Sequence, residues 1–210
     1  MPLLGPEVLI ATRNAGKVKE FVPMFEAKGI AVKSLLDYPE LPDIVEDGDT
    51  FAANALIKAR TIAERLGVPV VADDSGLCVD RLGGAPGVYS ARYAGEPSND
   101  AANNRKLLEE LAKVEADAAL QDGSDARGLS PARFVCAMAL VDAEGRVVAE
   151  AEGACEGVII GEPRGERGFG YDPLFYIPEL GQTMAELTLE AKNERSHRGQ
   201  AIRRLWEALS

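Results

Sequence analysis

Acidic side chains gather at two places in the sequence, and their types fit metal-dependent chemistry. Asp73 and Asp74 directly follow the apolar run at residues 68–72, and a second acidic segment at residues 46–49 precedes the helical pattern before that run. Carboxylate oxygens are the ligands that Mg²⁺ prefers, and a further carboxylate beside the metal can position or deprotonate a water molecule. The alternative is that Asp73 and Asp74 only cap a turn before Ser75 and Gly76.

A polar turn at residues 12–17 lies between an apolar run and the start of a helical pattern. Gly16 and Lys17 do not complete a Walker phosphate loop, because that pattern requires a Ser or Thr after the Lys and Val18 stands there. What remains is a strand-to-helix turn carrying Thr12, Asn14 and Lys17. Backbone N–H groups, the helix dipole and an ammonium all favour a phosphate at such a turn. A capped turn without any ligand is the alternative.

The C-terminal third contains a basic cluster in a chain that is otherwise acidic. Its members are Lys192, Arg195, His197 and Arg198. Arg offers fork-shaped donors and Lys a mobile charge, so the cluster indicates a contact with an anion or a base. The alternative is the solvated N-terminus of a helix, although cations at that end oppose the helix dipole. His197 is the only histidine, which excludes a His-rich metal site.

Two aromatic residues flank a glycine in the segment Phe169-Gly170-Tyr171-Asp172. A flat base can stack on an aromatic ring there, while backbone groups approach its edge. The alternative is an ordinary buried turn.

Apolar periodicity predicts the elements that hold these side chains. Helices are expected at residues 18–25, 51–66 and 100–113 and near the C-terminus. Thr50 or Asp49 is expected to cap the second helix, and Gly67 to end it. Strands are expected at residues 8–11, 68–72, 77–82, 134–141, 147–152, 157–160 and 174–177. Residues 33–50 are expected to form a loop and residues 115–131 a flexible insertion.

Strands joined by hairpins, together with strands separated by helices, predict a mixed sheet with helices packed on it, an α/β or α+β architecture. We expect one domain over residues 1–210, with two lobes around a central cleft.

Composition excludes several classes of protein. The chain has 210 residues, of which 23 are Lys or Arg and 34 are Asp or Glu, which gives a net charge of −11. Such a balance argues against a broad basic face for nucleic acid or an anionic membrane. The sequence shows no apolar stretch long enough to span a membrane and no signal-peptide pattern. Three widely spaced cysteines form no disulfide framework, so we expect a cytoplasmic protein.

These motifs together resemble the Ham1/RdgB-type inosine triphosphate pyrophosphatase family, also described as non-canonical purine nucleoside triphosphate pyrophosphatases. The resemblance rests on blocks that occur in family order from residue 8 to about residue 202. The blocks are Ala11-Thr12-Arg13-Asn14-Ala15-Gly16-Lys17, Thr50-Phe51 with Asn54 and Lys58-Ala59, Ala72-Asp73-Asp74-Ser75-Gly76-Leu77, the run at residues 82–93, Gly168-Phe169-Gly170-Tyr171-Asp172-Pro173 and Ser196-His197-Arg198-Gly199.

The resemblance implies an elongated mixed sheet in two α/β lobes and a homodimer. It implies Mg²⁺-dependent hydrolysis of inosine and xanthosine triphosphates and their deoxy forms between the α and β phosphates. The products would be the nucleoside monophosphate and pyrophosphate, so that damaged purines are kept out of nucleic acid. A nucleotide sensor without turnover and a pyrophosphatase for other modified nucleotides remain as alternatives.

The family pattern also implies roles for individual residues. Asp74 and Glu46 would hold Mg²⁺, and Asp74 would also accept the proton of the attacking water. The substrate would be bound by Thr12, Arg13, Asn14, Ala15, Gly16, Lys17, Ser75, Phe169, Gly170, Tyr171, Asp172, Lys192, His197 and Arg198. Two of these assignments are open: Arg13 replaces a small Gly that is common in the family, and Asp47 is an alternative to Glu46.

Overall fold

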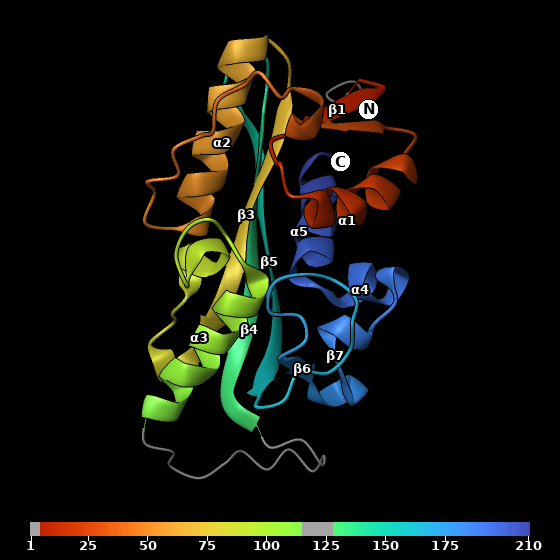
Figure 1. Ribbon diagram of the computed structural model, residues 1–210. Coiled ribbons are helices and arrows are strands. Elements are labelled where there is room, and N and C mark those ends of the chain that lie inside the picture. The colour runs from red at the N-terminus through yellow and green to blue at the C-terminus, as the bar shows by residue number, and fades with distance from the viewer. Residues whose placement is uncertain (1–4, 115–127) are drawn as a thin grey trace. The chain divides into compact units, whose positions relative to one another are not determined.

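The computed structural model describes residues 5–114 and 128–210, and Figure 1 shows how the elements follow one another along the chain. The helices are α1 (Ala15–Glu26), α2 (Phe51–Leu66), α3 (Asp100–Lys113), α4 (Leu189–Arg195) and α5 (His197–Ala208). The strands are β1 (Glu7–Ile10), β2 (Ala31–Ser34), β3 (Val70–Val79), β4 (Gly128–Val141), β5 (Val147–Ile160), β6 (Phe175–Ile177) and β7 (Gln182–Thr183).

The strands form one seven-stranded mixed sheet in the order β2-β1-β3-β4-β5-β6-β7. Strand β1 pairs in parallel with both of its neighbours, and Leu9 lies opposite Val70 of β3. At the other end of the order β6 pairs antiparallel with β5 and with β7, and Phe175 lies opposite Ile159. The expected α/β class, a mixed sheet with flanking helices, is confirmed.

The chain divides into two compact units. Unit 1 comprises Met1–Asp74, Cys136–Gly153 and Ser196–Ser210, and unit 2 comprises Ser75–Val135 and Ala154–Arg195. The single domain with a central cleft stays a prediction. Most of the expected insertion at residues 115–131 lies outside the described residues. Its last part was wrongly placed, because residues 128–131 begin β4 with buried and partly exposed side chains in alternation, and Pro131 falls on an exposed position.

The pleat of the strands builds a core on each face of the sheet in unit 1. Val8 and Ile10 of β1 pack in one cluster with apolar side chains of α1 and α5. Leu9, between them in sequence, packs in a second cluster with apolar side chains of α2. Because alternate residues of a strand face opposite sides of a sheet, α1 and α5 cover one face and α2 covers the other (Figure 1).

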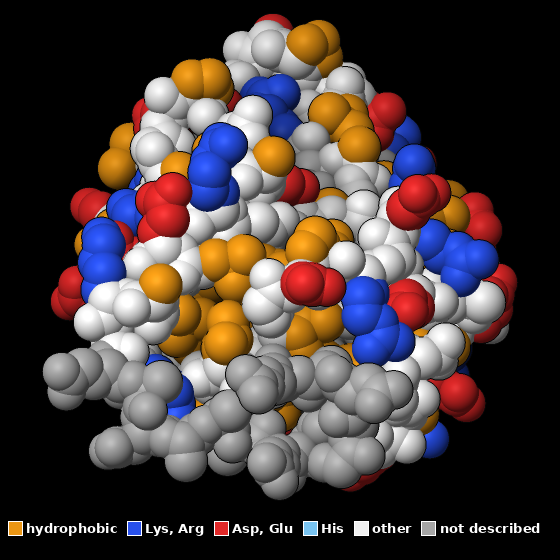
Figure 2. Space-filling view, turned by 60° about the horizontal axis from the view of Figure 1, so that its bottom comes forward, with side chains coloured by type: hydrophobic (Ala, Val, Ile, Leu, Met, Phe, Trp, Pro, Cys, Tyr) orange, Lys and Arg blue, Asp and Glu red, His pale blue; other side chains and the backbone are white. Residues whose placement is uncertain are grey.

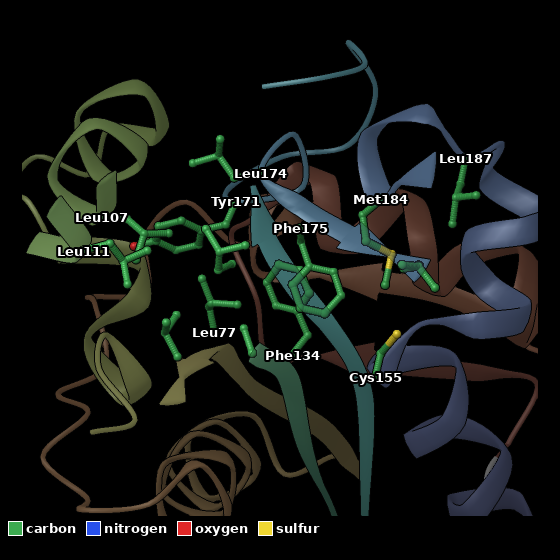
Figure 3. Packing of buried hydrophobic residues seen from close by; sticks show 14 residues of the cluster. Leu77, Leu107, Leu111, Phe134, Cys155, Tyr171, Leu174, Phe175, Met184 and Leu187 are labelled. Carbon is green, nitrogen blue, oxygen red and sulfur yellow. The ribbon is translucent and has the colours of Figure 1, made fainter. Parts of the chain in front are cut away.

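Unit 2 has its own core, which Figure 3 shows from close by. At its centre the rings of Phe134 and Phe175 lie 4.5 Å apart between centroids. Helix α3 contributes Leu107 and Leu111, which are buried in the same cluster as Tyr171. Among the described residues, the structure contains no helix that is both long enough and apolar enough to span a membrane.

Helix boundaries follow the expected signals. Thr50 caps α2, since its hydroxyl accepts a hydrogen bond of 3.1 Å from the backbone N–H of Ala53. Gly67 ends the helix in the left-handed conformation with φ of 64°.

Three expectations about strands were wrong. Residues 31–34, partly within the expected loop, form β2 and pair with β1. In place of the strands expected at 68–72 and 77–82 there is one strand, β3, because Asp73 and Asp74 are bound by charged side chains and do not require a turn. Residues 80–82, expected to be part of a strand, form a 3-10 helix. The strands expected at 147–152 and 157–160 are also one strand, β5.

Candidate active site

The N-terminus of α1 presents the polar turn at residues 12–17. Asn14 caps the helix, because its side-chain oxygen accepts a hydrogen bond of 3.1 Å from the backbone N–H of Lys17. The Thr12 hydroxyl in turn accepts a hydrogen bond from the backbone N–H of Asn14 at 3.1 Å. Ala15 and Gly16 form the first turn of the helix, where backbone N–H groups lack partners within the helix. This geometry suits an anion.

Asp73 forms ion pairs that connect α1 with the buried interior of unit 1. Its carboxylate is fully buried and lies 2.8 Å from Lys17 Nζ and 3.2 Å from Arg198 Nη2. Burial by itself would raise the pKa of Asp73, but the two neighbouring cations outweigh burial and hold that pKa well below its ordinary value. Asp73 is therefore a permanent anion that fixes the ammonium of Lys17.

Asp74 lies in a different set of contacts, made by α2. Asn54 Nδ2 donates to Asp74 Oδ2 at 3.1 Å, and Lys58 Nζ lies 3.3 Å from Asp74 Oδ1. Lys58 Nζ also lies 2.9 Å from Glu46 Oε2. The amide of Asn54 further accepts the backbone N–H of Gly48 at 2.8 Å, which ties the acidic loop to the helix. Glu46 and Asp74 thus meet at one ammonium.

Burial and neighbouring charges shift the pKa values of both Asp74 and Lys58. Burial raises the pKa of Asp74 above its ordinary value, although Lys58 and Lys17 oppose the shift. Burial also acts to lower the pKa of Lys58, but the surrounding carboxylates, Asp74 first, raise it above its ordinary value. Lys58 therefore stays charged, while Asp74 is a more basic carboxylate than an exposed one.

The acidic pair fits a magnesium ion that is shared with a ligand. Two carboxylates, Glu46 and Asp74, converge on the same cationic group, and both are hard oxygen donors. Asp47, the alternative to Glu46, is exposed. Within residues 5–114 and 128–210, no group of three or more His, Cys, Asp or Glu side chains could hold a metal. Mg²⁺ typically uses one or two carboxylates and completes its shell with waters and substrate phosphates, so the donor set fits.

Arg198 and His197 lie at the start of α5 inside unit 1. Arg198 is almost completely buried, and its guanidinium forms ion pairs with Glu20 and Asp73. Its charge is also 5.6 Å from the centre of the Phe21 ring. His197 is buried as the first residue of α5, which Ser196 caps. In this structure Arg198 is thus bound by two carboxylates.

Arg13 directly precedes the cap of α1, and its side chain contacts the segment after β2. Its guanidinium donates to the carbonyl oxygens of Leu35, at 3.1 Å, and Leu41. It also lies 3.4 Å from a carboxylate oxygen of Asp43. These contacts hold the loop that leads to Glu46.

The predicted residues of unit 2 form a separate group around Asp172. Lys192 Nζ lies 2.5 Å from Asp172 Oδ2, and the same oxygen accepts the backbone N–H of Phe169 at 3.0 Å. Lys192 Nζ is also 4.8 Å from the centre of the Phe169 ring. The hydroxyl of Tyr171 donates to the carbonyl of Ser90 at 2.8 Å. Ser75, partly exposed, belongs to this unit as well.

The sequence-based site therefore falls into two sets. Unit 1 contains residues 12–17, Glu46, Asp74, His197 and Arg198, and unit 2 contains Ser75, residues 169–172 and Lys192. Three residues that contact the first set had no predicted role: Glu20, Asn54 and Lys58. Asp73, a candidate metal ligand in the sequence, contacts Lys17 and Arg198. Asn54 and Lys58 carried a signal, since they lie four residues apart beside the apolar positions of a helical face.

The surface drawn in Figure 2 carries Lys and Arg side chains interspersed with Asp and Glu side chains. This face shows no continuous basic stripe of the kind that phosphate backbones require.

The fold and the two sets of residues define the class of protein. It is an α/β protein with a mixed sheet, a helix N-terminus suited to binding an anion, and a pair of carboxylates suited to a divalent cation. The sequence matches the Ham1 family over residues 8–208, and the chain belongs to that family. It is 53% identical over 206 residues to the dITP/XTP pyrophosphatase of Geobacillus kaustophilus, which covers 97% of this chain and 95% of that protein.

Solved structures of Ham1 proteins are similar to this chain in fold. A Ham1 protein from Coxiella burnetii is 40% identical, with a TM-score of 0.82 over 97% of this chain and 98% of its own. The Staphylococcus aureus Ham1 protein is 39% identical, with a TM-score of 0.78 over 97% of each chain. The resemblance inferred from the sequence motifs is confirmed.

Proposed function

We propose that this protein hydrolyses non-canonical purine nucleoside triphosphates, those of inosine and xanthosine and their deoxy forms, to the monophosphate and pyrophosphate. Membership of the Ham1 family supports the proposal, as does a relative named dITP/XTP pyrophosphatase that is similar over nearly the whole chain. The observation that carries it is the meeting of Glu46 and Asp74 at Lys58, in the same unit as the Asp73-bound Lys17 of α1.

The phosphates are assigned to the turn at residues 12–17 and to the lysines of unit 1. A nucleoside triphosphate carries about four negative charges, which the helix N-terminus, Lys17 and Lys58 can offset in part. Asp73 keeps Lys17 in place, and Lys58 already lies between the carboxylates. Arg13 acts indirectly in this scheme, because its guanidinium binds the loop after β2.

Asp74 is assigned as the group that takes the proton from the attacking water. The Asn54 amide fixes the orientation of its carboxylate, and Lys58 lies against its other oxygen. Glu46 and Asp74 would hold Mg²⁺, which when bound neutralises phosphate charge and polarises water. Breaking the bond between the α and β phosphates by attack at the α phosphorus releases pyrophosphate.

The base and ribose are assigned to residues 169–172, Lys192, His197 and Arg198, and Ser75 is assigned a contact with the substrate. A purine can stack on the Phe169 ring. Hypoxanthine and xanthine present a 6-oxo acceptor where adenine presents an amino donor, so donors on that edge leave adenine mispaired, and polar pairing of this kind discriminates by about 10⁴ or more. For Arg198 this role requires its guanidinium to exchange a bond to Glu20 or Asp73 for one to the base.

The protein is further proposed to act as a homodimer in the cytoplasm, on small nucleotides and without a nucleic-acid or membrane partner. The mixed surface charge in Figure 2 and the net charge of −11 support the last point.

The proposal is tested by incubating the purified protein with inosine, xanthosine, guanosine and adenosine triphosphates plus Mg²⁺, and by measuring pyrophosphate and orthophosphate separately. Rapid pyrophosphate release confined to the inosine and xanthosine forms is expected. Orthophosphate release would contradict cleavage between the α and β phosphates. No release from any of the four would contradict hydrolysis of these nucleotides and favour a sensor that binds them.

A further inference from the structure

Helix α3 holds both backbone polar groups of one residue in the aromatic turn of unit 2. The N–H of Gly170 donates to Asp100 Oδ2 at 2.7 Å. The carbonyl of Gly170 accepts a hydrogen bond from Asn104 Nδ2 at 2.9 Å. Asp100 and Asn104 are one helical turn apart and therefore lie on the same face of α3. No role for either residue follows from the motif that contains Gly170.

The turn needs such external support because its glycines leave it conformationally free. Gly168 and Gly170 have φ angles of 78° and 62°, in the left-handed region that glycine adopts without strain. Glycine also loses the most backbone freedom when it becomes ordered. Within the turn, Phe169 is bonded through its N–H to Asp172, which fixes one side of the aromatic residue. The bonds from α3 to Gly170 fix the other side.

Helix α3 is itself firmly anchored in unit 2. Asn103, next to Asn104, accepts the backbone N–H of Ala94 at 2.7 Å and donates to the carbonyl of Ala91 at 3.0 Å. One and two turns further along the same face, Leu107 and Leu111 are buried beside Tyr171, as Figure 3 shows. The first turn of α3 is therefore a rigid support for the neighbouring backbone.

We propose that Asp100 and Asn104 are positioning residues of the substrate site. They hold Gly170 so that the Phe169 ring and the Lys192 ammonium against it keep one arrangement, ready to receive a purine. The inference rests on the proposed function, because it takes the Phe169 ring as the surface on which the base stacks. Neither residue touches the base, and both act through the backbone of Gly170.

The two side chains allow variants that remove a single hydrogen bond. Asn104→Asp keeps the shape of the side chain but loses the donor to the Gly170 carbonyl. Asp100→Ala loses the acceptor for the Gly170 N–H. Asp100→Asn keeps an acceptor oxygen but loses the negative charge at the start of the helix, which separates hydrogen bonding from the helix dipole. Glu109→Gly is the control. Glu109 is exposed, and its replacement by glycine weakens α3 without removing a hydrogen bond to Gly170.

The first measurement is steady-state kinetics with inosine triphosphate. Asn104→Asp and Asp100→Ala are expected to raise KM about tenfold while kcat stays within about twofold, because a bond that orders the base site is lost and Asp74 is untouched. Asp100→Asn and Glu109→Gly should keep the wild-type KM. Equal KM values in Asp100→Ala and Glu109→Gly would overturn the inference, because they would reduce Asp100 to a contributor to helix stability.

The second measurement is hydrogen exchange at the Gly170 amide, which does not depend on turnover. Exchange should be about tenfold faster in Asp100→Ala than in the wild-type protein or Glu109→Gly. Unchanged exchange in Asp100→Ala would contradict the positioning role even if the wild-type protein is an active pyrophosphatase. A wild-type protein without turnover would overturn the proposed function instead, so the two failures are distinguishable.

Discussion

Adjacent aspartates in one strand have opposite environments, and the pleat of β3 is the cause. Neighbouring residues of a strand face opposite sides of the sheet. Asp73 contacts Lys17 of α1 and Arg198 of α5, which cover one face. Asp74 contacts Asn54 and Lys58 of α2, which covers the other. The pKa is lowered for Asp73 and raised for Asp74, so Asp73 is held as an anion, while Asp74 suits the role of base that we propose for it.

The role of base that we propose for Asp74 predicts the effect of replacing it. Asp74→Asn keeps an acceptor and the size of the side chain but cannot take a proton, so we expect kcat to fall by about 10² to 10⁴-fold. The variant should unfold at nearly the same urea concentration as the wild-type protein. Asp80→Asn is the control, because Asp80 directly follows the same strand and is exposed. Full activity of Asp74→Asn would remove Asp74 from proton transfer.

For Asp73 the structure predicts a loss of stability. Asp73→Asn leaves Lys17 without its carboxylate and Arg198 with Glu20 alone in a buried environment, and breaking a buried pair costs about 3–5 kcal/mol. Asp80→Asn breaks a pair with Arg133 that is 41% and 44% exposed, and we expect a loss of at most about 1 kcal/mol. Urea unfolding of both variants checks the contrast. Equal losses would show that the buried contacts of Asp73 contribute no more than a surface pair.

The pKa of Asp73 also sets the direction of a pH effect. Because the pKa is lower in the folded chain than the ordinary 3.8, the stability from Asp73 is fully present above that value. It is lost as the pH falls from there through the folded value.

The sequence predicts residues whose types could carry chemistry, but it does not predict all of the residues that hold them in place. Asp74 and Glu46 were predicted from acidic segments, and both contact Lys58 in the structure. Glu20 gave no signal, because its partner Arg198 is 178 residues away in sequence. Long-range ion pairs of this kind depend on how helices pack, which local spacing does not encode.

At the scale of elements, glycines explain why β5 was predicted as two strands. Gly153 and Gly157 interrupt the apolar pattern, which is typical of a break. In the structure they allow close approach: a Cβ on Gly153 would lie 2.2 Å from the carbonyl oxygen of His197, and one on Gly157 would lie 2.6 Å from the Phe175 ring. These glycines therefore allow neighbouring groups to pack closely against β5, and the strand continues through them.

Gly153→Ala should force α5 away from β5, because the nearest atoms belong to the helix backbone and cannot turn aside. We expect a loss of about 3 kcal/mol in the free energy of unfolding. Gly161→Ala is the matched control, since its Cβ would meet only Leu129 Cδ1 at 3.8 Å, and it should change stability by less than about 0.5 kcal/mol. Thermal or urea unfolding compares them. A stable Gly153→Ala variant would contradict the close contact.

Helices were the elements that sequence predicted best. α2 has its cap at Thr50 and its end at Gly67 as expected, because both signals act within one turn of the helix. β2 was missed because it is short and lies at the edge of the sheet, so its burial pattern shows only one buried residue. Strand pairing depends on distant partners, whereas helix caps are local.

The three cysteines are distributed over both units, so the reactivity of their thiols shows whether each unit is folded. Burial raises the pKa of Cys136, in unit 1, to about 12 and that of Cys155, in unit 2, to about 11. At pH 8 only about 10⁻⁴ of the Cys136 thiol is then the reactive thiolate. Cys78 is half-buried and its pKa is raised by burial as well.

We therefore expect a thiol reagent at pH 8 to modify only Cys78 in the folded protein. Cys136 and Cys155 should react together as urea is raised, because β3, β4 and β5 each contribute residues to both units and favour one cooperative transition. Mass spectrometry of labelled peptides measures this. Reaction of Cys155 at a much lower urea concentration than Cys136 would show that unit 2 unfolds independently.

We propose that water attacks the α phosphorus of a non-canonical purine triphosphate in a site built around Asp74. The most direct test is hydrolysis of inosine triphosphate with Mg²⁺ in water enriched in ¹⁸O, followed by mass spectrometry of both products. We predict one ¹⁸O atom in inosine monophosphate and none in pyrophosphate. Label in pyrophosphate would place the attack on the β phosphorus, and labelled orthophosphate would place it on the γ phosphorus; either result contradicts the claim.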